Sequence, residues 1–405
     1  MNEPAEAEQY ELSLYDHEFS VAYRHRVYFT RNAFDPGNPW LRDILVGPEH
    51  ADAGRLLVTL DQGVAGSYPS LEERITTYFS EGAATPRLVC PPVVLPGGEQ
   101  AKSGWSQVST VHELIHRHRI CRHSHVLAIG GGAHLDVVGF AAATAHRGVG
   151  HVRMPSTVLA QADSGVGVKN GINAFGQKNF VGSFAPPLAV LNDFALLTAL
   201  PPTQKRGGLA EAVKIALIRD RDFFETIATQ ADALAAFEPT ALEALIVRCA
   251  RLHVQHIVSC GDPFERGSAR PLDFGHWAAH KLECLSGYRL GHGDAVAIGI
   301  ALDTLYSARA GLLAPADAGR VVGLLERLGF PLWTPELELA ETDGRLSVLN
   351  GLNDFREHLG GRLTVTLLRD LGHGIDVHEM NPEWIREALG DLAGRSGSKK
   401  QAETP

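Results

Sequence analysis

The sequence predicts an N-terminal α/β domain built on a parallel sheet and joined to a C-terminal domain of helices. The chain has 405 residues, which is too long for one ordinary hydrophobic core and indicates two domains. Up to about residue 195, short apolar runs alternate with Gly-rich turns and helical stretches, as in repeated strand–helix units. After Pro201 and Pro202, apolar residues recur at three- and four-residue spacing, which indicates helices.

These patterns divide the chain into four parts. Residues 1–20 are polar and are expected to form a loose arm, followed by the α/β domain at 21–198. The helical domain is expected at 199–392, and the polar residues 393–405 are expected to form a disordered tail. A cleft between two such domains is the expected ligand site. The predicted strands are Val21–Thr30, Arg55–Leu60, Leu88–Leu95, Val126–Ile129 and His151–Met154, and the predicted helices are Leu209–Ile218, Ala241–Ser259, His276–Ser286 and Ala295–Ala310.

Composition restricts the possible partners. The net charge of −10 disfavours a nucleic-acid surface, although a locally basic pocket could still bind a phosphorylated small molecule. No apolar run is long enough to span a bilayer, and the N-terminus lacks a basic-then-apolar signal pattern. The five cysteines show no CxxC spacing, which indicates reduced thiols. We therefore expect a cytoplasmic protein without nucleic-acid or membrane partners.

A glycine turn follows one of the predicted strands. Gly130–Gly132 precede a helical stretch, so their backbone N–H groups could approach a pyrophosphate at the helix N-terminus. Leu135 stands where the dinucleotide fingerprint has its third glycine, so an ordinary tight turn is equally compatible with the pattern. Asp61 at a strand end is placed to accept from a ribose hydroxyl, and Glu99 and Lys102 lie in a nearby loop. Each of these three, taken singly, could also be a solvated charge.

The helical domain contains a candidate metal site. His276 and His280 are four residues apart on one predicted helix, and His292 follows His276 by sixteen residues. Together with Glu211, two imidazoles and one carboxylate would form a catalytic-type site with an open coordination position. A single histidine is more often a surface residue, but three close together, beside glycines, favour ligation. Two other histidines lack this context and are interpreted as structural or surface residues, namely His253 and His256.

Basic and amide side chains gather in Gly-rich loops. Arg147, Lys169 and Lys178 lie within about thirty residues, together with Asn179. Arginine and lysine side chains can each contribute about 1.5–3 kcal/mol through charge-assisted hydrogen bonds to phosphate. The alternative is an exposed basic loop without a ligand.

These segments together resemble the 3-dehydroquinate synthase superfamily of sugar-phosphate cyclases over residues 20–385. The motifs that carry the resemblance are GGEQAKS, IGGGAHLDVVGFAAATAHRG, PSTVLAQADSGVGVKNGIN, GLAEAVK and DFGHWAAH followed by GHGDAVAIG. The resemblance implies a homodimer with a Rossmann-like NAD-binding domain and a helical metal-binding domain. It also implies that NAD and a Zn²⁺ or Co²⁺ ion bind in the cleft between them.

The resemblance also implies roles for individual residues. The implied metal ligands are Glu211, His276 and His292. The implied NAD contacts are Asp61, Glu99, Lys102, Gly131, Gly132, Asp136, Thr157 and Lys178. The implied substrate or phosphate contacts are Arg147, which is expected to reach the partner subunit's site, with Lys169, Asn179, Lys214, Asp273 and His280. Asp163 is expected between cofactor and substrate, and Lys169, Lys214, Asn179, Asp163 and His280 are the candidate catalytic residues.

The sequence departs from the superfamily where dehydroquinate synthases bind the substrate carboxylate. Gln255 and Ala269 stand where those enzymes have a lysine and an arginine, and Arg270 is one residue away from a compensating position. Loss of two charge-assisted contacts would weaken carboxylate binding by about 3–6 kcal/mol. Arg356 or His358 is expected to replace a lysine pair that helps bind phosphate. We therefore predict a small sugar phosphate without a carboxylate, sedoheptulose 7-phosphate, as the substrate.

The predicted reaction yields a C7 cyclitol, an epimer of valiolone, as in the valiolone-type synthases. It comprises transient oxidation by NAD, phosphate elimination, re-reduction and an intramolecular aldol closure, which makes the enzyme a carbon–oxygen lyase. One alternative is 3-dehydroquinate synthase, acting on a carboxylated heptulosonate phosphate. Another is a metal-dependent alcohol or polyol dehydrogenase, although Ile215 stands where that family has a histidine. A non-catalytic NAD- or sugar-phosphate-binding protein is the third alternative.

Overall fold

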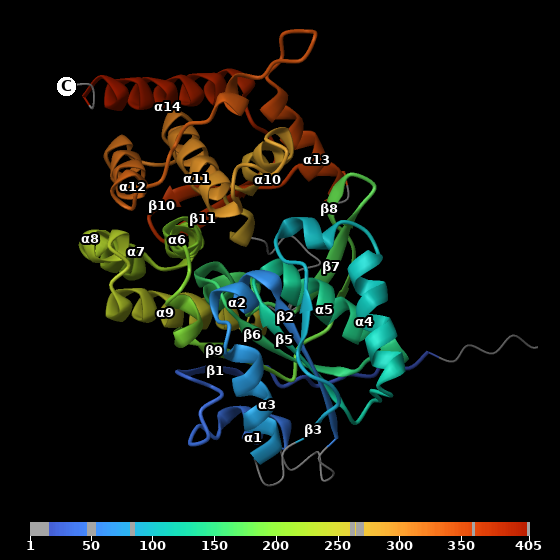
Figure 1. Ribbon diagram of the computed structural model, residues 1–405. Helices are drawn as coiled ribbons and strands as arrows, with labels where there is room; N and C mark the ends of the chain where they lie inside the picture. Colours follow the sequence, from blue (N-terminus) through green and yellow to red (C-terminus); the bar gives the residue numbers. More distant parts are fainter. Residues whose placement is uncertain are drawn as a thin grey trace, which may run out of the picture.

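The computed structural model describes residues 16–46, 54–81, 86–259, 264, 271–358 and 361–402. A parallel sheet with helices on both faces forms the N-terminal half, and a layer of helices packs above one edge of it (Figure 1). This is the fold class that the sequence predicted. The arrangement follows from the two textures of the sequence, because strand–helix units bury a sheet on both faces whereas amphipathic helices pack on one another.

The sheet is parallel throughout. Its order is β1-β9-β6-β5-β2-β3, and β4 also pairs with β2. The central strands β2, β5 and β6 are buried over most of their length, which explains their continuous apolar runs. The strands are β1 (Val27–Thr30), β2 (Arg55–Asp61), β3 (Arg87–Leu88), β4 (Val93–Leu95), β5 (His125–Gly130), β6 (Gly150–Pro155) and β9 (Ala189–Asp193).

Two predicted strands differ from the observed ones. The run Val21–Thr30 forms a strand only from Val27 onward, and residues 21–24 before it are exposed. The run Leu88–Leu95 is divided into β3 and β4, because Pro91 and Pro92 lack the N–H groups that a continuous strand needs.

Helices cover both faces of the sheet and the strand order creates a crevice at its edge. Helices α1 (Trp40–Leu45) and α3 (Leu71–Glu81) pack on one face, and α4 (Ser106–Arg117) and α5 (Gly132–Thr144) pack on the other. The chain leaves β2 through the short helix α2 (Gln62–Ser67) toward β3 and β4, whereas β5, on the other side of β2, leads to β6. The strand order therefore reverses between β2 and β5, and ligands bind at such switch points.

The helical domain packs around α11 (His292–Arg309), in which 13 of 18 residues are buried. Two hairpins accompany the helices: β7 (Lys169–Ala174) with β8 (Gln177–Phe184), and β10 (Val365–Asp370) with β11 (His373–Val377). The second hairpin lies in the domain that the sequence predicted as all helical.

Among the described helices, none has the length and apolar character to cross a membrane. The other helices are α6 (Pro202–Arg219), α7 (Arg221–Thr229), α8 (Ala231–Ala235), α9 (Pro239–Ser259), α10 (His276–Leu285), α12 (Pro315–Arg327), α13 (Asn350–His358) and α14 (Pro382–Ala402).

The C-terminal segment is helical where the sequence predicted disorder. Helix α14 extends to Ala402, so the predicted tail at 393–405 is wrong for residues 393–402, and the last three residues lie outside the described chain. Ile385, Leu389 and Leu392 are buried and fix the first turns of α14 on the domain. Arg395 lies 3.8 Å from Glu326 and extends this contact. Once the first turns dock, helix nucleation is complete, and each further residue adds one helical hydrogen bond as its backbone is fixed.

Acidification is expected to destabilise the α/β domain through His151 on β6. Burial, with a smaller effect of the Arg153 charge, lowers the pKa of His151 from its ordinary value of 6.5 to about 3. The unfolded chain therefore binds more protons than the native chain between these values, so stability is lost as the pH falls below about 6.5. From pH 7.5 to 5.5, His151 is expected to remove about 1.4 kcal/mol of the free energy of unfolding. Urea unfolding of the wild type and of His151→Gln at both pH values tests this; equal pH dependence in the two proteins would contradict it.

Candidate active site between the two domains

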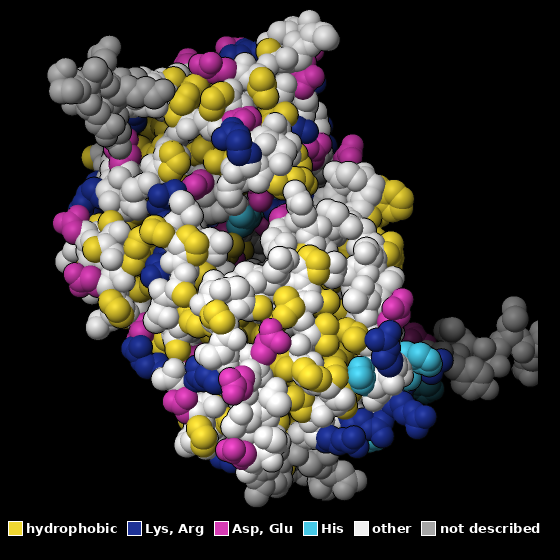
Figure 2. All heavy atoms as spheres, in the orientation of Figure 1, with side chains coloured by type: hydrophobic (Ala, Val, Ile, Leu, Met, Phe, Trp, Pro, Cys, Tyr) yellow, Lys and Arg dark blue, Asp and Glu magenta, His cyan; other side chains and the backbone are white. Residues whose placement is uncertain are grey.

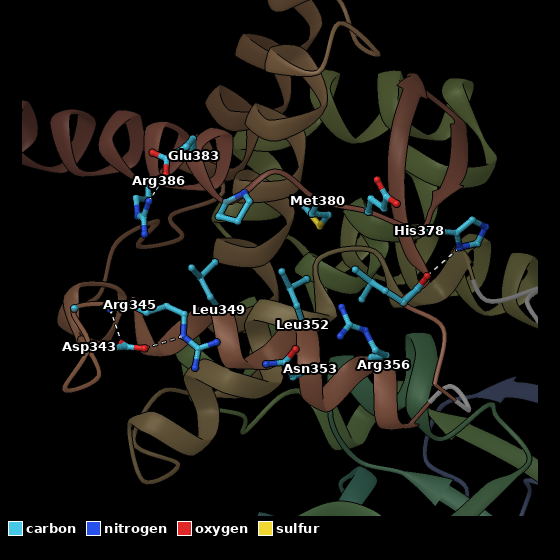
Figure 3. A pocket seen from close by; sticks show the side chains of 14 residues that line it. Asp343, Arg345, Leu349, Leu352, Asn353, Arg356, His378, Met380, Glu383 and Arg386 are labelled. Atoms are coloured by element: carbon cyan, nitrogen blue, oxygen red, sulfur yellow. Dashed lines mark hydrogen bonds and ion pairs between the residues drawn. The ribbon is translucent and has the colours of Figure 1, made fainter.

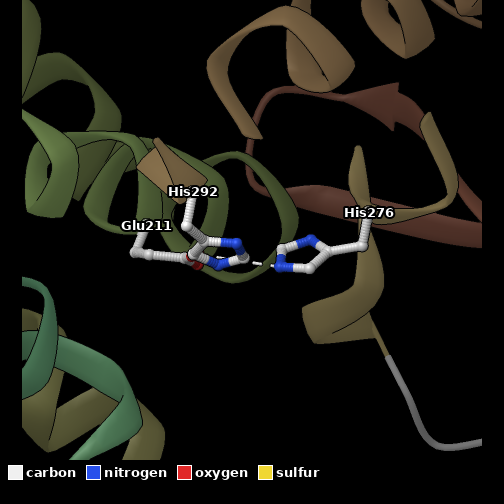
Figure 4. A group of neighbouring side chains, drawn as sticks. All are labelled: Glu211, His276 and His292. Atoms are coloured by element: carbon white, nitrogen blue, oxygen red, sulfur yellow. Dashed lines mark ion pairs between the residues drawn. The ribbon is translucent and has the colours of Figure 1, made fainter. Parts of the chain in front are cut away.

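Three side chains from three helices of the second domain meet at the cleft. Glu211 lies in the middle of α6, and His276 and His292 are the first residues of α10 and α11. Oε1 of Glu211 lies 3.6 Å from Nε2 of His276 and 3.2 Å from Nε2 of His292. Figure 4 shows these three side chains, here called the triad, pointing toward one another. In the space-filling view the surface is hollowed between the two halves of the molecule, with a histidine side chain visible in the hollow (Figure 2).

The triad fits a divalent metal ion. Ligand atoms bound to one tetrahedral Zn²⁺ at 2.0–2.1 Å lie about 3.4 Å apart, close to the two measured separations. Oε1 of Glu211 is buried and has no hydrogen-bond donor of suitable geometry within the described part of the chain. A buried carboxylate oxygen of this kind needs a cation or donor to replace water. One carboxylate and two imidazoles also form the donor set of catalytic zinc sites.

Close helix contacts place the triad. Gly207 of α6 and Gly293 of α11 touch, so that a Cβ atom built on Gly293 would lie 2.3 Å from the Cα of Gly207. Beside this contact, Arg206 binds Asp294 through both carboxylate oxygens at 3.1 and 3.2 Å. On its other side, α6 packs at Gly208 against the backbone of the α/β domain. Glycines at these crossings therefore allow the helices carrying Glu211 and His292 to approach.

A buried chain of charges extends from the triad toward the α/β domain. Nζ of Lys214 contacts Glu211 and lies 3.8 Å from Asp163. Burial opposes charge on all three groups, but their mutual attraction prevails: the pKa values of both carboxyl groups are lowered, and that of the Lys214 ammonium is raised. Nδ1 of His253, on α9, lies 2.6 Å from Asp163. His253, interpreted from sequence as structural or surface, therefore contacts the site, and only the packing of α9 reveals this.

A second group of titratable side chains adjoins the triad. The His280 ring lies 5.3 Å from that of His276 and 6.2 Å from that of His292. Burial, followed by the neighbouring His276, lowers the pKa of His280 well below its usual value, so this imidazole is uncharged at neutral pH. Glu283 lies 3.2 Å from Nδ1 of His292 and escaped the sequence analysis. Its position seven residues after His276, on the same helix face, was the available signal.

The cofactor residues predicted at the glycine turn meet at the switch point between β2 and β5. Asp61 ends β2 and caps α2, and a Cβ on Gly130, at the end of β5, would lie 2.8 Å from it. Gly131 is the N-cap of α5 and supplies no side chain to the first-turn N–H groups, which leaves them able to bind an anion. Thr157 accepts a hydrogen bond from the N–H of Ala160 at 3.1 Å and closes the next turn. A dinucleotide pyrophosphate fits such a crevice of backbone donors.

Ion pairs connect the remaining predicted cofactor residues. Lys102 lies 2.7 Å from Asp136 and contacts the side chain of Asn179. Lys178 lies 3.9 Å from Glu99, and its nearer partner is Glu283, at 2.8 Å. Glu99 and Lys102 lie in a 3-10 helix, Asp136 in α5, and Lys178 and Asn179 in β8. Glu283, in α10, comes from the helical domain, so the pair Lys178–Glu283 connects the two domains.

Arg153 is a buried cation that the sequence analysis missed. It is fully buried in β6 and donates to the carbonyl groups of Gly167 and Lys169, at 3.0 and 2.7 Å, and to Oδ1 of Asn170 at 2.7 Å. It therefore fixes the loop between Asp163 and β7. A charged residue inside a predicted buried strand was the available signal, since such a charge requires compact partners.

Several predicted substrate residues do not meet the triad. Arg147 is exposed beyond the C-terminal end of α5, about 20 Å of helix away from the glycine turn. Arg356 lines a separate cavity of about 700 Å³, together with Leu352, Asn353 and His378 (Figure 3). Its assignment to the phosphate site is therefore not supported, because α13 turns this side chain toward α14 and the end of β11. Arg270 and the side chain of His358 lie outside the described residues.

The structure also describes the two remaining predicted substrate residues, Lys169 and Asp273. Lys169 opens β7 with an exposed side chain, and its carbonyl group accepts from Arg153. Asp273, half-buried in the short 3-10 helix Pro271–Asp273, contributes to raising the pKa of Lys214.

Comparison with known proteins agrees with this geometry. The 3-dehydroquinate synthase N-terminal family matches residues 92–207 and the corresponding C-terminal family matches residues 208–348. A 3-dehydroquinate synthase from Halorhodospira halophila is 34% identical over 338 residues, covering 82% of this chain and 93% of the relative. A 2-epi-5-epi-valiolone synthase from Streptomyces glaucescens is 35% identical over 314 residues, covering 77% of each chain.

A solved structure has the same fold. It is the 2-epi-5-epi-valiolone synthase ValA from Streptomyces hygroscopicus subsp. jinggangensis 5008 with NAD⁺ and Zn²⁺ bound, which matches with a TM-score of 0.83 and 27% identity over 94% of this chain and all of the other. The site and these similarities define a protein of the sugar-phosphate cyclase class, with a candidate metal site at its cleft. The chain belongs to the 3-dehydroquinate synthase family.

Proposed function

We propose that this protein cyclises sedoheptulose 7-phosphate to a C7 cyclitol of the valiolone type, with release of phosphate. The observation that carries the proposal is the triad beside Lys214 and Asp163, at the cleft where the cofactor crevice opens. Glu211, His276 and His292 would hold Zn²⁺ or Co²⁺, and the crevice between β2 and β5 would hold NAD. When bound, the metal polarises substrate hydroxyl groups and NAD accepts and returns a hydride.

The residues of the chain supply the remaining chemistry. Lys214 remains charged because of its two carboxylate neighbours, and it would stabilise negative charge that develops on substrate oxygens. His280 is an uncharged imidazole beside the triad and would accept or donate a proton. Asp163 would orient Lys214 from the α/β side. The helices that close around Glu211 and His276 exclude water from the reacting centre.

The preference for a substrate without a carboxylate rests on the cations of the site. Gln255, uncharged and exposed on α9, stands where carboxylate-binding relatives are expected to have lysine. Lys214 and Lys178, beside the triad, are each opposed by carboxylates of the chain itself. A substrate with one phosphate and two metal-bound hydroxyl groups would bring fewer negative charges to these lysines than a substrate that also has a carboxylate, so it fits the charges of the site better.

Phosphate release with each substrate tests the proposal. With NAD and Zn²⁺ or Co²⁺, kcat/KM for sedoheptulose 7-phosphate is expected to exceed that for the carboxylated heptulosonate phosphate by about 10²–10⁴-fold, which corresponds to two lost charge-assisted contacts. The reverse preference would identify a 3-dehydroquinate synthase, the activity of several relatives. Net accumulation of NADH would identify a dehydrogenase, and NMR of the carbocycle would identify the epimer.

The assembly is proposed to be a homodimer. Arg147 is exposed and remote from the triad of its own chain, which is compatible with a role at the site of a second copy. Sedimentation of the purified protein, with Arg147→Ala as a variant that should lose activity without losing metal, would test both parts.

A further inference from the structure

Glu283 is a buried carboxylate whose two oxygens have different partners. Its side chain is 4% exposed. Oε2 lies 3.2 Å from Nδ1 of His292, and Oε1 lies 2.8 Å from Nζ of Lys178. A buried carboxylate requires such partners in place of water. Both oxygens of Glu283 are therefore committed to fixed contacts.

His292 meets a carboxylate through each ring nitrogen. Nε2 faces Glu211 in the triad, whereas Nδ1 faces Glu283. The other histidine of the triad is arranged in the same way, since Nδ1 of His276 lies 3.0 Å from the carbonyl oxygen of Phe274. A metal-binding histidine commonly donates its second ring N–H to such an acceptor, which fixes the tautomer and the ring orientation. We propose that Glu283 is a positioning residue that holds the Nδ1 proton of His292 and directs Nε2 to the metal.

A second metal ion is the competing explanation for the same side chains. His280, Glu283 and His292 bring ligand atoms within 4.8 Å of one another. However, the Lys178 ammonium group already contacts Glu283, and a second ion would have to displace it. His292 would also have to bind one ion through each nitrogen, which requires loss of its last ring proton. One ion per chain is therefore expected.

The two contacts of Glu283 allow a matched pair of variants. Glu283→Gln cannot serve both partners, because one end of the amide is an NH₂ group that can accept from neither the imidazole N–H nor the ammonium group. If the amide rotates to satisfy Lys178, its NH₂ group faces Nδ1 and favours the tautomer with a proton on Nε2, which cannot bind metal. Lys178→Met, by contrast, removes the partner of Oε1 and leaves the contact with His292 in place.

Zn²⁺ affinity, measured on the full chain by competition with a chelating dye, provides the test. The proposal rests on the metal site of the proposed function but not on its substrate. Because the titration needs no substrate, an inactive enzyme on sedoheptulose 7-phosphate would leave the proposal standing. Glu283→Gln is expected to raise the Kd about 10–100-fold. Lys178→Met is expected to leave the Kd close to that of the wild type.

Three results would overturn the proposal: an unchanged Kd in Glu283→Gln, an equal loss of affinity in Lys178→Met, or two zinc ions per chain by elemental analysis. Glu283→Asp replaces the first variant if circular dichroism shows that Glu283→Gln does not fold. Its shorter side chain cannot reach both partners, so a raised Kd is expected there as well. Glu387→Gln, at an exposed glutamate that binds Arg309 on the surface, controls for the loss of one negative charge.

Discussion

Replacing Glu211 with glutamine is expected to abolish metal retention and to lower kcat/KM at least about 10³-fold. The amide removes the charge that faces both imidazoles and places an NH₂ group near Lys214, which would then be a buried ammonium without its closest partner. Polarisation by a metal ion contributes several kcal/mol to such reactions, and each 1.36 kcal/mol is a factor of ten in rate. Metal content after dialysis and the initial rate of phosphate release are the two measurements.

Glu225→Gln is the matched control for this variant. Glu225 is a partly exposed glutamate on α7 that forms an ion pair with Arg320 and makes no described contact with the triad, so the same chemical change should leave metal content and rate unaltered. NAD binding should survive in both proteins, because the crevice between β2 and β5 does not include Glu211. A metal-free Glu211→Gln protein with wild-type kcat/KM would remove the metal from the mechanism.

Gly293→Ala is expected to have the second largest effect. A methyl group at this position would lie 2.3 Å from both the Cα and the carbonyl oxygen of Gly207, so α6 and α11 must separate. Overpacking of this kind costs about 1–3 kcal/mol of stability. It also shifts His292 relative to Glu211, and misplacement of a catalytic group by about 1 Å can cost a factor of about 10² in rate. A raised Kd for zinc, a lower kcat/KM and a lower free energy of unfolding are all expected.

Gly323→Ala separates this effect from the general consequence of adding a methyl group to a helix. Gly323 lies within α12, and a Cβ atom built there meets nothing within 4 Å. Alanine in place of an unconstrained helical glycine should stabilise the protein by about 0.5–1 kcal/mol and leave zinc affinity unchanged. If Gly293→Ala also stabilised the protein, the contact between α6 and α11 could not be what places the triad.

The separate cavity that includes Arg356 illustrates where sequence reasoning is weakest. When a ligand-binding residue of the family is absent from a sequence, a residue nearby in the chain can replace it only if the backbone turns its side chain toward the ligand. Arg356 lies near the expected position along the chain, but α13 presents its side chain to α14 and the end of β11. Nearness along the chain did not show in which direction the Arg356 side chain points.

The sequence by itself determined the fold class and the Gly-rich turn after β5, because these depend on local periodicity and residue type. It also supplied the candidate metal ligands by residue type, and the resemblance to a known family singled out the triad among them. Only the tertiary structure decided that His253, Glu283 and Arg153 belong to the site and that the last helix continues to Ala402. The physical reason is the same in each case. Their partners lie on other elements of the chain. The role of a buried charged group depends on neighbours that only folding brings within hydrogen-bonding distance.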